Sequence, residues 1–286
     1  MGETIVENVL LSINQILRVD NLEEAQTHYE NMLAQVTPAY LEALFFEALI
    51  IEKQQGLESA CNTYQKFLNA VAGCNLDNEL LHRAKLAKSK LYLSFLRKNI
   101  KNVDFSIISN NCWGSFIYQY LGLAYNTPFI GLYLFAPDYI KMITNLKDYL
   151  QQPLFFTNKS KFDFELKRRG ILDAYPIGII GDVEIHFRHY DNKDIAKEKW
   201  VRRLERINYN NLYFEFCDRE LCDKKLLEEF DALSFTHKVC FTAKEYPELK
   251  SCVWIKEDSN KSYVEYEWYK FPKYFNLVKW LNSKSQ

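Results

Sequence analysis

The chain has 286 residues, of which 48% are hydrophobic, so it can bury a substantial core in one large or two modest domains. Its 36 basic and 37 acidic residues give a formal net charge of -1, and no overall field favours nucleic acid or an anionic membrane surface. The seven cysteines form no CxxC pair and no zinc-ligand spacing, and no apolar stretch is long enough to cross a bilayer. We therefore expect a cytoplasmic globular protein with reduced thiols, no metal, no nucleic-acid partner and no membrane span.

The first 98 residues carry apolar side chains at three- and four-residue spacing, which predicts helix throughout. Leu22-Glu23-Glu24-Ala25 recurs as Leu57-Glu58-Ser59-Ala60, at an offset of 57 − 22 = 35 residues. This offset is close to the period of about 34 residues of tetratricopeptide hairpins. Thr37-Pro38 and Gln55-Gly56 mark turns. We therefore predict an all-α, tetratricopeptide-like module over 1–98, which either cradles a protein partner or caps the next domain.

From residue 104 onward, short apolar runs alternate with amphipathic stretches. The predicted strands are Phe105–Ile108, Phe129–Phe135, Leu154–Thr157, Ile177–Ile180, Val183–Phe187, Leu212–Phe216, Val239–Thr242 and Tyr263–Trp268. The predicted helices are Ser115–Leu121, Pro137–Leu150, Asn192–Ile207, Cys222–Leu233 and Lys273–Leu281. This alternation predicts an α/β domain over 104–286, with helices on both faces of a mixed or mostly parallel sheet.

The polar turn after the first of these strands is the leading candidate for a functional site. The apolar run ends in polar residues and helix-compatible residues follow Gly114, so the segment predicts strand, tight turn and helix N-terminus. Cys112 would then lie at the positive end of the helix dipole, a setting that lowers the pKa of a thiol. Asn110 and Asn111 could donate to an oxyanion beside it. The alternative is that Cys112 is a small buried core residue.

Two histidines, His186 and His189, lie three residues apart near the end of a later strand. Their side chains would fall on opposite faces if the strand continued, which argues against a shared metal ion. His189, at the strand-to-helix junction, is placed to act as a general base, and His186 is a candidate for substrate binding. A hydrogen-bonded structural role is the alternative for a histidine at such a junction.

Charged residues further along the chain complete the candidate set. Arg202 and Arg206 lie four residues apart on one face of the following helix, where they could bind an anionic substrate or form exposed ion pairs. Asp218 and Arg219 follow the strand Leu212–Phe216 directly. Because the carboxyl ends of parallel strands meet at one edge of a sheet, we expect both residues near Cys112.

Several motifs of the second domain together resemble a bacterial family catalogued as a domain of unknown function and often labelled exopolysaccharide biosynthesis protein. They are Ser109-Asn110-Asn111-Cys112-Trp113-Gly114, Tyr118-Gln119, Leu121-Gly122-Leu123, Thr127-Pro128-Phe129-Ile130-Gly131-Leu132, Tyr175-Pro176-Ile177-Gly178, Glu184-Ile185-His186-Phe187-Arg188-His189-Tyr190, Trp200-Val201-Arg202-Arg203 and Arg206-Ile207-Asn208. The resemblance covers about residues 104 to 250 and implies a three-layer α/β/α domain found with capsule, exopolysaccharide or lipopolysaccharide genes. It implies no particular reaction. The Asn-Cys turn is also similar to that of coenzyme-A-binding capsule acetyltransferases, which carry Gly-Asn-Cys-Gln where this chain has Asn111-Cys112-Trp113.

Turn geometry and resemblance together lead us to expect a cytoplasmic enzyme of surface-polysaccharide assembly that transfers an acyl group to a sugar hydroxyl. A coenzyme A thioester is the candidate donor. Cys112 would accept the acyl group or line the thioester site, and Asn110 and Asn111 would stabilise the tetrahedral oxyanion. His189 would deprotonate the thiol or the sugar hydroxyl.

Two alternatives belong to other functional classes. In a glycosyl or phospho-sugar transferase, Arg202, Arg206 and Asp218 would hold a nucleotide or a phosphate. In a non-catalytic protein, the helical module would recruit a partner, and the α/β domain would recognise glycan by stacking of tyrosine and tryptophan rings.

Overall fold

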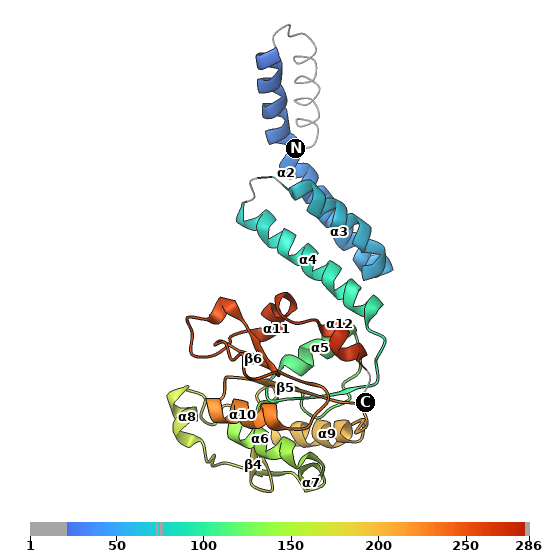
Figure 1. Cartoon of the computed structure of the whole chain (residues 1–286). Coiled ribbons are helices and arrows are strands. Elements are labelled where there is room, and N and C mark those ends of the chain that lie inside the picture. The colour runs from blue at the N-terminus through green and yellow to red at the C-terminus, as the bar shows by residue number, and fades with distance from the viewer. Residues whose placement is uncertain (1–21, 73, 75–76, 284–286) are drawn as a thin grey trace. The chain divides into compact units, whose positions relative to one another are not determined.

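The computed structural model describes residues 22–72, 74 and 77–283, and within residues 22–37 it describes the backbone alone. The chain divides into two compact units, with the boundary between Lys98 and Asn99 (Figure 1). No helix in the part of the chain that the structure describes combines the length and the apolar character needed to span a membrane.

The first unit contains three described helices: α2 (Leu22–Gln55), α3 (Leu57–Val71) and α4 (Asn78–Asn99). Phe45 of α2 contacts the rings of Tyr64 and Phe67 of α3, and α4 adds Leu80, Ala84 and Ala87 to the same core. A polar link crosses this core, because Glu52 accepts a hydrogen bond from Tyr64 Oη at 2.6 Å and pairs with Lys90 Nζ at 2.5 Å.

The predicted turn at Thr37-Pro38 is wrong, because α2 continues through Pro38. An internal proline costs a helix about 3 kcal/mol, and continuing the helix places Leu41, Leu44, Phe45 and Ala48 in the core. The second predicted turn is confirmed: Gly56, at φ +88°, separates α2 from α3. Part of the proposed repeat falls on residues 1–21, outside the described residues, so the tetratricopeptide-like module and its partner remain predictions.

The second unit is a mixed α/β unit built on a four-stranded sheet in which all neighbouring strands are parallel, in the order β1-β5-β6-β7. The strands are β1 (Ser106–Ser109), β5 (Leu212–Cys217), β6 (Lys238–Thr242) and β7 (Cys252–Trp254). A second, antiparallel sheet contains β2 (Phe155–Thr157), β3 (Ile177–Ile180) and β4 (Val183–His186). The single sheet expected from the sequence is therefore two sheets, of which the larger is parallel.

Helices lie on both faces of the four-stranded sheet (Figure 1). The described helices of this unit are α5 (Trp113–Leu121), α6 (Ala136–Thr144), α7 (Leu146–Leu150), α8 (Asp163–Arg168), α9 (Lys193–Leu204), α10 (Lys224–Ala232), η1 (Lys256–Asp258), α11 (Glu267–Lys270), η2 (Phe271–Lys273) and α12 (Leu277–Asn282). Phe216 of β5 stacks on Tyr139 of α6, with ring centroids 5.4 Å apart. Tyr213, whose side chain points to the opposite face of the strand, contacts Trp280 of α12 at 4.8 Å.

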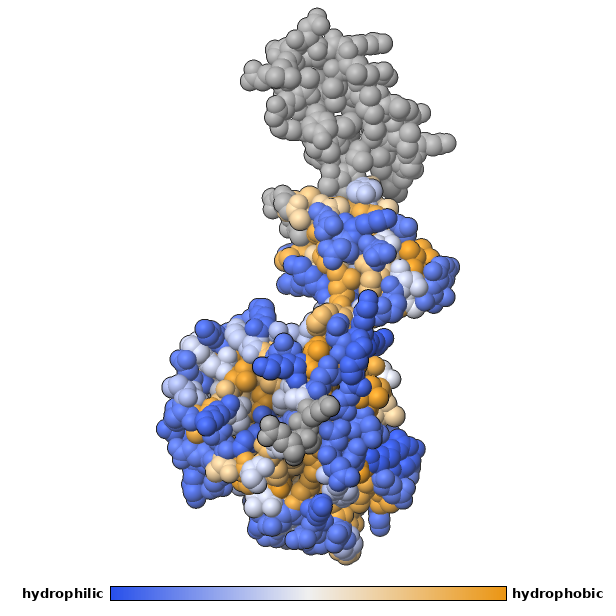
Figure 2. Space-filling model, turned by 45° about the vertical axis from the view of Figure 1, so that its right-hand side comes forward, coloured by the Kyte–Doolittle hydropathy of each residue, from blue (hydrophilic) through white to orange (hydrophobic). Residues whose placement is uncertain are grey.

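Two predicted strands are absent from the described structure. Residues 129–135 form a loop joined to β4 by one bridge between Tyr133 and His186, because Gly131 takes φ +69° and interrupts the extended run. In the segment Tyr263–Trp268, Tyr266 takes φ +55° and α11 begins at Glu267. Figure 2 shows mainly hydrophilic residues on the visible face of this unit, with smaller hydrophobic patches between them.

Candidate functional site

A cavity of about 340 Å³ brings together segments that are far apart in the sequence. It is lined by Cys112, Ser115, Phe116, Gln119, Tyr125, Ile130, Gly131, His189, Tyr190, Lys199 and Arg203. Helix α5 supplies the residues at spacing three, four and seven after Cys112, and α9 supplies the two cations. The volume lies within the range of small-molecule sites, which is about 300 to 1,000 Å³. Cys112 and His189 therefore share one cavity.

Cys112 is the residue that immediately precedes α5, at the end of the turn that follows β1. Burial raises the pKa of its thiol to about 11, with a further contribution from the nearby carboxylate of Glu267. This direction is opposite to the lowered pKa expected from the helix dipole. The dipole is outweighed because desolvation and the carboxylates of Glu267, Glu215 and Glu220 oppose ionisation of the thiol, while the charge of Arg219 favours it. The thiol is therefore protonated at neutral pH.

Asn110 and Asn111 are buried and do not line the cavity. Asn111 Oδ1 accepts a hydrogen bond from the backbone N–H of Trp113 at 2.7 Å, and its Nδ2 donates to Cys217 Sγ at 3.2 Å. These bonds fix the strand-to-helix turn and occupy the amide that was expected to hold an oxyanion. Asn110 Nδ2 is buried without a hydrogen-bond partner among the described residues.

His189 is held in place through its backbone. Its N–H donates to the carbonyl oxygen of Gly131 at 2.9 Å, which ties the segment after β4 to the loop before α6. Burial, and then the positive charge of Arg188, lowers the pKa of the imidazole below its ordinary value of 6.5. The ring is therefore neutral at pH 7, which is the form that a general base requires. No hydrogen bond joins this ring to the Cys112 thiol within residues 77–283.

His186 lies in an aromatic cluster instead of the cavity. Its ring stacks on Tyr133 with centroids 4.7 Å apart and meets Phe135 and Tyr175 edge-on. Burial, followed by the charge of Arg169, lowers its pKa to about 3. A neutral ring enclosed by aromatic side chains packs the core between β4 and the loop before α6, and it has no path to a ligand in the cavity.

The two cations of α9 that face the cavity are Lys199 and Arg203, and not the pair chosen from the sequence. Arg202 and Arg206 are exposed, and Arg202 pairs with Glu198 at 3.4 Å. Arg203 is 8% exposed and its Nη1 donates to Tyr190 Oη at 2.6 Å. Trp200 was the sequence signal that could have identified this face of the helix. Because Trp200 is a core residue, its neighbours Lys199 and Arg203 face inward, while the predicted residue Arg202 does not.

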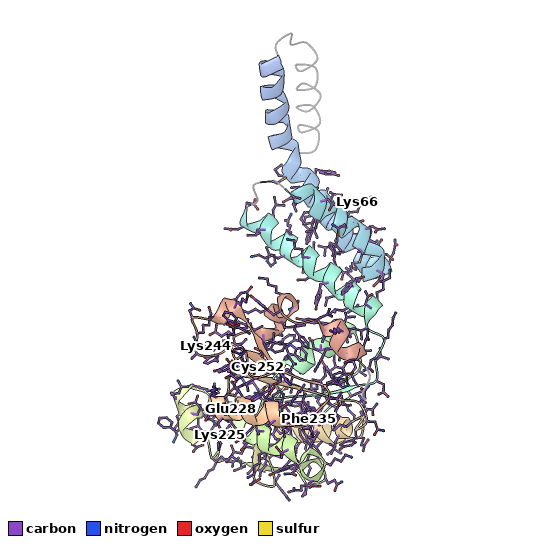
Figure 3. The ribbon with its side chains drawn as sticks, in the orientation of Figure 1. Lys66, Lys225, Glu228, Phe235, Lys244 and Cys252 are labelled. Atoms are coloured by element: carbon purple, nitrogen blue, oxygen red, sulfur yellow. The ribbon has the colours of Figure 1, made fainter. Side chains whose placement is uncertain are left out.

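Asp218 and Arg219 lie at the carboxyl edge of the sheet, as expected, but outside the cavity. Asp218 accepts hydrogen bonds from the backbone N–H of Ala243 at 2.6 Å and of Val264 at 2.8 Å, so it joins two loops. Burial raises its pKa to about 6. Lys244, a cation at the same edge that is labelled in Figure 3, donates to the Ser259 carbonyl oxygen at 2.6 Å.

A buried acidic cluster, which the sequence did not predict, occupies the carboxyl end of β5. Glu215 lies opposite Ser109 in the strand register and accepts a hydrogen bond from its hydroxyl at 2.5 Å. Burial, and then the proximity of Glu267, raises the pKa of Glu215 to about 8. Arg219 pairs with Glu267 at 3.1 Å and with Glu220 at 3.4 Å. We call Glu215, Glu267, Glu220 and Arg219 the acidic cluster.

Comparison with known proteins places the chain in a family. The pattern of the family described as a domain of unknown function (DUF1919) matches residues 84–282. An uncharacterized protein of Haemophilus influenzae is 36% identical over 194 residues, which are 65% of this chain and 88% of that protein. The match includes the cavity, both sheets and most of α4. The chain therefore belongs to the DUF1919 family.

Proposed function

We propose that this protein transfers an acyl group to a sugar hydroxyl in the biosynthesis of a bacterial surface polysaccharide. The observation that carries the proposal is the shared cavity: Cys112 and His189, 77 positions apart, line one space of about 340 Å³ beside two cations. The polysaccharide context rests on the resemblance of the sequence motifs, and the acyl chemistry rests on a neutral imidazole in a cavity that also contains two cations.

The thiol pKa supports one of the two roles that the sequence left open for Cys112. With a pKa of about 11, about one thiol in ten thousand is ionised at pH 7, which makes Cys112 a poor resting nucleophile. The imidazole of His189 is neutral and can accept a proton. We therefore assign Cys112 to the wall of the thioester site and His189 to the base that acts on the acceptor.

The proposed step moves one acyl group and one proton. The hydroxyl oxygen of the sugar attacks the thioester carbonyl carbon while His189 takes the hydroxyl proton. A new carbon–oxygen bond forms, the carbon–sulfur bond breaks, and His189 returns the proton to the departing thiolate. A site that orients the two reacting groups lowers the entropic cost of their encounter.

The test is transfer of a labelled acetyl group from acetyl-coenzyme A into the sugar fraction of a bacterial metabolite extract. We expect His189→Ala to reduce the rate by about 10² to 10⁴-fold, because it removes the base. Cys112→Ser should retain most of the rate, since the side chain lines the site without forming the bond. His82→Ala and Cys61→Ser, both in the first unit, are the matched controls. Absence of labelled sugar, or equal rates for His189→Ala and His82→Ala, would refute the proposal.

One observation favours a second candidate, glycosyl or phospho-sugar transfer. Lys199 and Arg203 face the cavity, and cations of this kind bind the diphosphate of a nucleotide sugar as readily as that of coenzyme A. The arginines first considered for this role do not support it, because Arg202 is exposed on another face of α9 and Arg206 is exposed in the turn after that helix. Stabilisation by nucleotide sugars without stabilisation by coenzyme A, measured by thermal shift, would favour this candidate.

A further inference from the structure

We infer that Lys199 and Arg203 form a phosphate-binding subsite, which holds the phosphate or diphosphate of the donor molecule against the wall of the cavity. The two residues are four positions apart on α9, so their side chains lie on one face of the helix, and both line the cavity. The inference deepens the proposed function, because it names the ligand chemistry of the same site.

The first argument is that Arg203 is a buried cation without a counter-charge. Only 8% of the residue is exposed, and no carboxylate lies within ion-pair distance of its guanidinium in the part of the chain that the structure describes. Its polar partner is the neutral hydroxyl of Tyr190, and its guanidinium lies 4.9 Å from the centroid of the Tyr125 ring. Arginine is rarely buried unless it is paired, because an isolated charge loses its hydration without compensation.

The hydroxyl of Tyr190 cannot supply that counter-charge. It donates its own hydrogen bond to the carbonyl oxygen of Ile130 at 2.6 Å, and burial raises its pKa above the ordinary value of 10, so it stays neutral. The contact positions the guanidinium without neutralising it. Nη2 and Nε of Arg203 remain as donors for a ligand, in the planar arrangement that matches two phosphate oxygens.

The second argument is the composition of the cavity wall. Lys199 adds a second positive charge one helical turn from Arg203, with its Nζ 5.9 Å from the ring centroid of Tyr190. No aspartate or glutamate lines this cavity, although Asp and Glu make up 37 residues of the chain. The hydroxyl of Ser115, which accepts a hydrogen bond from the Gly131 N–H at 3.4 Å, keeps its own hydrogen as a further uncharged donor on the cavity wall. Two cations with a neutral donor and no acid favour an anion that carries more than one charge, as phosphate and diphosphate do.

Diphosphate is common to coenzyme A and to nucleotide sugars, so the experiment uses probes that separate the two sources. Isothermal titration calorimetry of the full chain would compare inorganic pyrophosphate, coenzyme A and a uridine diphosphate sugar. We expect millimolar or tighter binding of pyrophosphate and tighter binding of one of the two larger molecules, which identifies the donor class.

Three substitutions on α9 and one in the turn that follows it provide the test and its matched controls. Lys199→Gln and Arg203→Gln remove the inferred ligands, and we expect each to weaken binding of the preferred probe by roughly tenfold to a hundredfold. Arg202→Gln and Arg206→Gln make the same change in charge on the exposed face, and we expect less than about a twofold effect, because they keep the cavity intact. Tryptophan fluorescence would verify folding of each variant, and Arg203→Lys serves if Arg203→Gln does not fold.

The inference is overturned if the wild-type chain binds none of the three probes, or if the exposed pair weakens binding as much as the cavity pair. Its failure is distinct from failure of the proposed transfer. A chain that binds diphosphate through Lys199 and Arg203, and whose transfer is unaffected by His189→Ala, retains the subsite and loses the acyl mechanism. If the wild-type chain transfers acetyl groups, and if Lys199→Gln and Arg203→Gln bind the preferred probe as tightly as the wild type, the mechanism stands and the subsite is refuted.

Discussion

The cavity wall and the acidic cluster each contain a largely buried arginine, but only the acidic cluster surrounds it with carboxylates. Arg219 pairs with Glu267 and Glu220, and Glu220 also pairs with Arg169 at 2.5 Å. Arg203 has the hydroxyl of Tyr190 and the ring of Tyr125. An arginine that is already paired with carboxylates stabilises the fold. A buried arginine without a carboxylate can instead pair with an anionic ligand.

Cys112 is influenced by both regions, and this explains the raised pKa of its thiol. It opens on the cation-lined cavity, yet the charges that raise its pKa after burial are the carboxylates of Glu267, Glu215 and Glu220. The charges of the acidic cluster therefore control the ionisation of a side chain that lines the cavity. Four measurements can test the difference between the cavity wall and the acidic cluster.

The largest contrast is expected between the two arginines themselves. Arg219→Met should lower the free energy of unfolding by about 3 kcal/mol, because Glu267 stays buried without its cation. Arg203→Met should cost about 1 kcal/mol or less in the absence of ligand, since Tyr190 keeps its bond to Ile130. Urea unfolding followed by tryptophan fluorescence reports on this unit, because all five tryptophans lie after residue 99. Equal losses of unfolding free energy in Arg219→Met and Arg203→Met would contradict the distinction between a paired and an unpaired arginine.

The pH dependence of stability should depend on Glu215. Its pKa is about 8 in the folded protein, compared with an ordinary value of 4.5, so the native state binds the extra proton between these values. Stability from this group is complete below pH 4.5 and is lost as the pH rises to about 8. Glu215→Gln should flatten this fall, which we expect to be on the order of a few kcal/mol. The measurement is the urea midpoint at several pH values, and identical profiles for the variant and the wild type would contradict the assignment.

The thiol of Cys112 provides a direct probe of the acidic cluster. We expect its alkylation by iodoacetamide, followed by mass spectrometry of the peptide that contains it, to rise with pH toward a midpoint near 11. A midpoint below 8 would show that the helix dipole outweighs burial and the carboxylates. In that case Cys112 would return as a candidate nucleophile.

The smallest effect is expected on the exposed face of α9. Arg202→Gln breaks the pair with Glu198, in which both side chains are more than half exposed. The free energy of unfolding should change by less than about 0.5 kcal/mol, because water screens such pairs. A loss comparable to that of Arg219→Met would show that the exposed pair has a structural role that its geometry does not suggest.

Local sequence patterns were sufficient to predict the strand, turn and helix around Cys112. The apolar residues of β1, the polar turn and Gly114 act within twelve residues, so no distant contact is needed to interpret them. His189 was likewise expected to act on the Cys112 thiol, and the two residues share a cavity although their segments follow strands of different sheets. The hydrogen bond that Asn111 Oδ1 accepts from the Trp113 N–H could not be predicted, because this donor comes within reach only in the folded turn.

The features that were missed depend on contacts across the fold. The inward face of α9 is set by the packing of Trp200 against Phe129, which lies 71 residues earlier. The acidic cluster depends on the register that places Ser109 opposite Glu215 and on α11, which was expected to be a strand. The antiparallel sheet was assigned to the main sheet because three short apolar runs carry no information about which partner they pair with.

The close approach of Gly131 to the segment after β4 has a consequence for any occupant of the cavity. A Cβ atom at this position would stand 3.2 Å from Tyr190 Cε2 and 3.4 Å from His189 Cβ, and its φ of +69° already disfavours a side chain. The loop and the segment after β4 can therefore pack this closely only with glycine at position 131. A side chain at this position would displace Tyr190 or His189, and both of these residues line the cavity.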